Sequence, residues 1–208
     1  MDLALGGELV ERAMARCRDG DALEAIIADT VLHGAAGAPS PVWDAVASVD
    51  SAPDVVGLGR WVTEKIAERP PPPHLSAIWF GLYELETKGG ATHAAIQLSG
   101  GPGFPEDPQW LFKQDWYTPG YAPTPGLASL LALAAPAGPD LYWLVSYAVV
   151  FAYTLGLVGT TLDRLDPQAL LGQRSQVGVA AGFHDGDIAL VGVLEPSGLD
   201  RSELDWAG

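Results

Sequence analysis

Cysteine is nearly absent from the sequence. Cys17 is the only one among 208 residues, so an intramolecular disulfide is excluded and a reducing, cytoplasmic compartment is expected. The first residues also lack a basic segment followed by a sustained apolar run, and we therefore expect no secretory signal. The four histidines (His33, His74, His93 and His184) are dispersed without a spacing suited to zinc, so no metal site is predicted.

Basic residues are scarce as well. The chain has 11 Lys and Arg against 26 Asp and Glu, which gives a formal net charge of -15. The electrostatic field of such a negative charge repels phosphate backbones and anionic lipid headgroups, so nucleic acid and membranes are disfavoured as partners. A basic protein partner would be attracted instead. Acidity also keeps a protein soluble, and that interpretation requires no partner.

Motifs of the common catalytic and nucleotide-binding sites are missing. The sequence contains no P-loop, no dinucleotide fingerprint after a strand, no G-x-S-x-G elbow and no H-E-x-x-H. His184, Asp185 and Asp187 could hold a hard cation or act in acid–base chemistry. A tight turn requires Asp and Gly at these positions in any case, and the hairpin explains them without further cause. We therefore predict no catalytic residue and no cofactor.

Charge is absent from one long stretch, residues 141–162, which is long enough to span a bilayer. Its flanks, Asp140 and Asp163, provide no positively charged anchor, and the stretch contains serine, threonine and glycine. Small or semi-polar side chains recur in it at steps of three and four and predict one helical stripe: Tyr142, Ser146, Val149, Tyr153, Gly156 and Thr160. We predict a helix buried in a globular core rather than a membrane span.

Helices are predicted throughout the first third of the chain. Apolar residues at helical spacing indicate helices over about 9–17, 23–31, 41–49 and 54–66. Prolines 70–73 then forbid continuation, because they lack a backbone donor and fix their own backbone angle. We predict a single domain, 1–208, in which a stiff connector at 70–74 joins a helical subdomain (1–69) to an α+β subdomain (75–208).

Two β-hairpins are predicted after the connector. One joins 75–86 to 91–98, and the other joins 177–183 to 188–194 through an Asp-Gly turn. In the first strand, Glu84 and Glu86 share a face and look like the solvated side of a half-covered sheet. Helices are expected between the hairpins, one of them capped by Thr124 before Pro125. This order predicts an α+β fold with a roughly four-stranded antiparallel sheet packed on helices.

The segment from Gly100 to Pro125 is too long and too rich in proline for a mere connection. It concentrates aromatic rings among carboxylates, which is typical of interface hot spots when the rings point outward. The alternative is that the rings fold back and plug the core. If they point outward, the partner-binding residues are Glu106, Asp107, Trp110, Asp115, Trp116, Tyr117 and Tyr121.

In size, charge and its aromatic–acidic loop, the chain resembles the small acidic α+β proteins that bacteria use as immunity partners for toxins. The resemblance implies a non-enzymatic, antitoxin-like domain that occludes a basic protein surface. A second hypothesis is a small-molecule binder or enzyme with a pocket between the sheet and the 141–162 helix, lined by Tyr142, Tyr153 and His184. A third is a self-associating domain whose exposed aromatics close a homodimer.

Overall fold

The computed structural model describes residues 3–86, 92–106, 110 and 113–202. Its first part is helical, as predicted, and α4 ends just before the run of prolines. The helices of this part are α1 (Leu3–Arg18), α2 (Leu23–Gly37), α3 (Val42–Ala47) and α4 (Ala52–Glu68).

The strands form one mixed sheet in the order β3-β2-β1-β4-β5-β6. They are β1 (Ala77–Glu86), β2 (Thr92–Gly101), β3 (Trp116–Tyr117), β4 (Val177–Phe183), β5 (Ile188–Glu195) and β6 (Gly198–Asp200). Both predicted hairpins are present, because β1 pairs antiparallel with β2 and β4 pairs antiparallel with β5. The two hairpins meet through β1 and β4, which run parallel.

The α+β class is therefore confirmed, and the prediction of a four-stranded antiparallel sheet is wrong. A long helical crossover separates β1 and β2 from β4, and such a connection can return the chain in the same direction as an earlier strand. The two short edge strands, β3 and β6, are too brief to show a hydrophobic period.

The crossover consists of α5 (Pro125–Ala134), α6 (Pro139–Trp143), the π-helical segment η2 (Leu144–Val149), α7 (Val150–Leu162) and α8 (Pro167–Leu171). In the described part of the chain, Pro139–Leu162 is the one helix long and apolar enough to cross a membrane, and most of it is buried in the fold. That burial is typical of the core helix of a soluble domain, as the sequence predicts.

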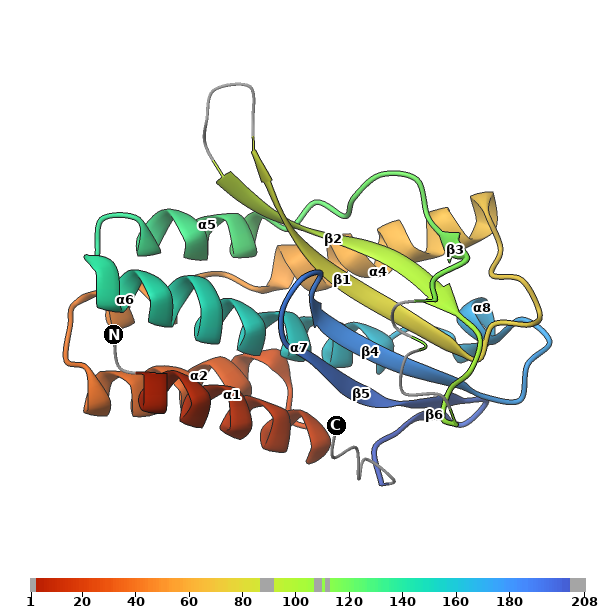
Figure 1. Cartoon of the computed structure of the whole chain (residues 1–208), viewed down its shortest axis with the longest axis horizontal. Coiled ribbons are helices and arrows are strands. Elements are labelled where there is room, and N and C mark those ends of the chain that lie inside the picture. Colours follow the sequence, from red (N-terminus) through yellow and green to blue (C-terminus); the bar gives the residue numbers. More distant parts are fainter. Residues whose placement is uncertain (1–2, 87–91, 107–109, 111–112, 203–208) are drawn as a thin grey trace.

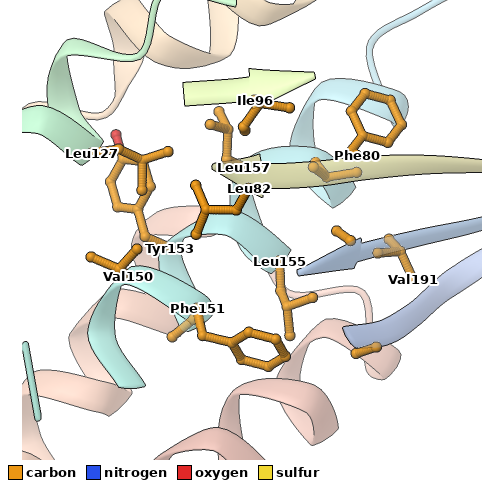
Figure 2. Close-up of a cluster of buried hydrophobic side chains, with 14 of the residues drawn as sticks. Phe80, Leu82, Ile96, Leu127, Val150, Phe151, Tyr153, Leu155, Leu157 and Val191 are labelled. Atoms are coloured by element: carbon orange, nitrogen blue, oxygen red, sulfur yellow. The ribbon is translucent and has the colours of Figure 1, made fainter. Parts of the chain in front are cut away.

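The two faces of the sheet are covered by different parts of the chain. Helices gather behind one face (Figure 1), where Phe80 and Leu82 of β1 join Phe151 and Leu155 of α7 in the main core (Figure 2). The opposite face carries a smaller buried cluster, made of Ala77, Trp79, Trp110 and Ala180 with Phe104 and Ile188 packed against it. The segment that follows β2 thus covers the second face of the sheet.

Candidate functional site

The two tryptophans of the 100–125 segment are buried. Trp110 is 0% exposed in the smaller cluster, edge-on to Phe104, and Trp116 is 2% exposed in the main core. Of the two alternatives that the sequence leaves open, these indoles follow the second and fold back into the protein, so Trp110 and Trp116 are not exposed partner-binding residues. A long segment with little regular structure needs apolar anchors of its own, and these two rings serve as anchors.

Two further residues of the segment contact the end of α4 and the connector that follows it. Asp115 accepts a hydrogen bond from the ring of His74 at 2.8 Å. The guanidinium of Arg69 lies 4.9 Å from the ring centre of Tyr117, in a cation–π arrangement. Asp115 and Tyr117 thus have partners within the chain, and these contacts attach the segment to the connector and to the end of α4.

The other predicted contact residues are scattered. Glu106 is exposed, and Asp107 lies outside the described residues. Tyr121 packs edge-on against Tyr83 of β1, with ring centres 5.5 Å apart. The predicted residues therefore do not form one exposed aromatic patch. Tyr83, which Tyr121 contacts, lines a different site.

This site is a groove of about 460 Å³ at the carboxyl ends of the parallel strands β1 and β4. We call it the β1–β4 groove. The described residues that line it come from β1, from α6 and η2, and from the end of β4 with the turn that follows it: Leu82, Tyr83, Glu84, Tyr142, Trp143, Ser146, Tyr147, Phe183, His184, Asp185 and Gly186. A pocket between the sheet and the long apolar helix is thus present. Tyr142 and His184 line it, and Tyr153 does not.

The helical wall of the β1–β4 groove is a stack of rings. Tyr147 stacks on both Trp143 and Phe183, with ring centres 5.2 Å apart in each pair and the planes nearly parallel. Its hydroxyl donates to the carboxylate of Asp187. Trp143 rests on Gly6 of α1, where an added Cβ would overlap its six-membered ring. Because the ring of Tyr147 stacks on two other rings and its hydroxyl is bonded to Asp187, this wall is held firmly.

The π-helical segment orients this wall. Tyr142 and Ser146 face the groove, whereas Tyr153 bonds to α4 and Thr160 accepts the amide of Leu23 in α2. A π turn holds more residues than an α turn, so it shifts the phase of the side chains on either side of it. The prediction of one continuous stripe from Tyr142 to Thr160 is therefore wrong. Segments of this kind recur at functional sites.

The sheet wall supplies carboxylates and a histidine. Glu84 is exposed to solvent, as predicted. It nevertheless follows Phe80 and Leu82 on the face of β1 that the helices cover, at the end of the strand where the groove opens. The side chain of Glu86 lies outside the described part of the structure. The ring of His184 stacks on Tyr83 at 4.4 Å, and its backbone amide donates to the carbonyl of Leu82 at 2.9 Å. The turn after β4 is thereby attached to the end of β1.

The lining of the β1–β4 groove combines aromatic rings with negative charge. Glu84 and Asp185 are exposed, and neither carboxylate makes a hydrogen bond or ion pair with another described residue. None of the described lining residues is Lys or Arg. Ring faces and carboxylates both attract cations, so the groove favours a positively charged group. Among the described residues, no group of three or more His, Cys, Asp and Glu could hold a metal ion.

A second polar cluster lies in the core. Asp54 of α4 is 0% exposed. Its carboxylate accepts the amide of Gly126 at 3.0 Å, the amide of Leu127 at 3.3 Å and the hydroxyl of Tyr153 at 3.0 Å. Burial raises the pKa of Asp54, against the opposing effect of these hydrogen bonds, and burial beside this carboxylate also raises the pKa of Tyr153.

Asp54 thus caps α5 from another helix. The predicted cap, Thr124, instead donates its hydroxyl to the carbonyl of Ala94 at 3.1 Å. Sequence reasoning missed this cluster because an aspartate in the first turn of α4 is typical of an ordinary helix start. All of its polar groups are satisfied internally, so we assign it to stability.

Fold and site together define an acidic α+β domain with an aromatic, carboxylate-lined groove. No family model matches the sequence, and neither a curated protein nor a solved structure matches the chain.

Proposed function

We propose that the chain is a non-enzymatic binding protein, of the immunity or antitoxin-like kind, that docks a basic protein partner in the β1–β4 groove. The observation that carries the proposal is the lining of the groove, where ring faces and the carboxylates of Glu84 and Asp185 lack a described basic neighbour. The net charge of -15 adds long-range attraction for the same partner.

The polar groups of the groove favour binding over catalysis. Tyr147 and Asp187 are bonded to each other. Ser146 makes no hydrogen bond to a described base that would activate it as a nucleophile. The other lining groups are ring faces, the carboxylates of Glu84 and Asp185, and the imidazole of His184, which stacks on Tyr83. In the described part of the chain His184 has no side-chain hydrogen bond to a nucleophile that it could activate.

Charge reversal in the groove tests this function. The protein would be purified from its native cells with the wild-type sequence, with Glu84→Lys and Asp185→Lys together, and with Glu64→Lys. Glu64 is an exposed residue of α4 that does not line the groove. We expect a stoichiometric basic protein with the wild type and the Glu64 variant, and its loss with the groove variant. Equal recovery from all three would exclude the groove as the binding site.

A small organic cation is the second candidate ligand. The groove volume of about 460 Å³ lies within the range of roughly 300–1,000 Å³ that small-molecule sites span. Thermal unfolding with a panel of aromatic and quaternary ammonium compounds would detect such a ligand, because binding to the folded state raises the melting temperature. Stabilisation by a small cation, without any protein partner in the pull-down, would favour this candidate. Homodimer formation stays a prediction for sedimentation at several concentrations.

A further inference from the structure

Among the described residues that line the groove, the ring of Tyr142 has no ring contact, and the carboxylates of Glu84 and Asp185 have no basic partner. We propose that the group it binds is a guanidinium, the side chain of an arginine on the partner protein, held by Tyr142, Glu84 and Asp185. This inference rests on the proposed function and names the chemical group that the site recognises.

Most rings of the groove are already engaged. Trp143 and Phe183 both stack on Tyr147. His184 covers a face of Tyr83, and Tyr121 meets the same ring edge-on.

Tyr142 differs from these rings. It is 45% exposed and has no ring contact with another described residue. Its phenol is therefore the stacking surface that the groove offers to a ligand.

The carboxylates of Glu84 and Asp185 lie on other walls of the groove. Glu84 projects from the end of β1, on the face that the helices cover, and Asp185 projects from the β4–β5 turn. Tyr142 belongs to α6, on the helical wall. A ligand in the groove therefore has an aromatic surface and separate acceptors available at the same time.

A guanidinium group can use the aromatic surface and the separate acceptors at the same time. It is planar and weakly hydrated, so its face stacks on a ring while its N–H groups point outward to acceptors in the plane. An ammonium is a compact, strongly hydrated charge that cannot present a face and a fork together. The chain uses both contacts elsewhere: Arg69 lies over Tyr117 at 4.9 Å, and Arg12 donates to both oxygens of Asp29 at 3.0 and 2.9 Å.

The test uses the full chain and three peptides that are identical except for one central residue. This residue is arginine, lysine or citrulline, which has nearly the shape of arginine without its charge. Binding would be followed by amide chemical shifts and by calorimetry at millimolar peptide. We expect the arginine peptide to bind about tenfold more tightly than the lysine peptide, and the citrulline peptide not to bind.

Variants locate the binding site. Tyr142→Leu, Glu84→Gln and Asp185→Asn should each weaken the arginine peptide severalfold, whereas Glu64→Gln should leave its affinity unchanged. All four side chains are exposed, and the peptide comparison on the unmodified protein does not depend on how the variants fold.

The outcomes separate the two proposals. Equal affinity for arginine and lysine, with loss of both in the groove variants, would overturn the guanidinium inference and leave the proposed function standing. Binding of citrulline as tight as that of arginine would also overturn the inference, because charge would then be irrelevant. If no peptide shifts any amide of the groove, both proposals fail.

Discussion

Tyr153 of α7 donates its phenolic hydroxyl to the buried carboxylate of Asp54 in α4, at 3.0 Å. The same carboxylate accepts the first free amides of α5. Three helices that are distant in sequence therefore meet at one carboxylate. Gly126 is required there, because an added Cβ would overlap the Tyr153 hydroxyl.

Removing this hydroxyl should destabilise the fold. Tyr153→Phe deletes one hydrogen bond to a buried carboxylate, and we expect a loss of about 2 kcal/mol in the free energy of unfolding. Asp54→Ala should cost more, since it leaves several buried donors unpaired. Urea unfolding measures both. Tyr142→Phe, at a half-exposed tyrosine, is the control and should change little; a cost equal to that of Tyr153→Phe would contradict the assignment.

Neighbouring residues of β3 should differ sharply in their contribution to stability. Trp116 is 2% exposed and Tyr117 is 54% exposed. Trp116→Ala removes a core ring and should cost about 3–5 kcal/mol. Tyr117→Ala loses its contact with Arg69 and should cost about 1 kcal/mol or less. Chemical denaturation of the two variants gives the comparison, and a larger loss for Tyr117→Ala would show that the segment presents its indole outward.

Acid should weaken the link between α1 and α2. The guanidinium of Arg12 bonds to Asp29 and lowers the pKa of that carboxyl below its ordinary value. Since the folded-state pKa lies below the unfolded one, this contact stabilises the fold above the ordinary aspartate pKa and is lost as the pH falls through the folded value. The gap in denaturation midpoint between the wild type and Asp29→Asn should therefore be larger at pH 7 than at pH 3. A gap that widens in acid would contradict this sign.

The thiol of Cys17 should be inert in the folded protein. It is 4% exposed, and burial raises its pKa to about 11. Because the thiolate is the reactive form, a thiol reagent at pH 8 should modify the native protein only as fast as it unfolds. One equivalent should react promptly in denaturant. Fast modification without denaturant would mean that α1 opens locally.

The sequence pattern predicts the local elements well, because their causes are local. The uncharged stretch 141–162 is a core helix, and the Asp-Gly turn joins β4 to β5. The parallel pairing of β1 with β4 depends on where the crossover helices pack, which no short-range pattern specifies. For this reason the predicted antiparallel sheet could not be distinguished from the mixed one.

The site was predictable only in part. Tyr142 and His184 were expected beside a pocket and do line the groove. Tyr153 was expected with them, but the π-helical segment between it and Tyr142 changes the phase of the helix, and an α-helical period does not include that change. The burial of Trp110 and Trp116 likewise depends on tertiary packing. An aromatic ring in a loop looks the same in the sequence whether it binds a partner protein or packs on the sheet of its own chain.

Two adjacent glycines of α1 offer a test of how the helical wall of the groove is held. Gly6 contacts the ring of Trp143, whereas an added Cβ at Gly7 would meet no atom within 4 Å. Gly7→Ala should therefore stabilise the protein by about 0.5–1 kcal/mol, the usual gain from replacing glycine by alanine in a helix.

Gly6→Ala adds the same methyl group and gains the same helix propensity, but the new methyl group must displace the ring of Trp143 from its position against α1. We expect a net loss of stability, a changed tryptophan emission and weaker binding of the arginine peptide. The reason is that the stacked rings of Trp143, Tyr147 and Phe183 would lose their support from α1. Thermal unfolding, fluorescence and calorimetry on the two variants would measure these effects. If Gly6→Ala and Gly7→Ala stabilise the protein equally and bind the peptide equally, then Trp143 does not rest on α1, and the rigidity of the groove must come from the sheet side.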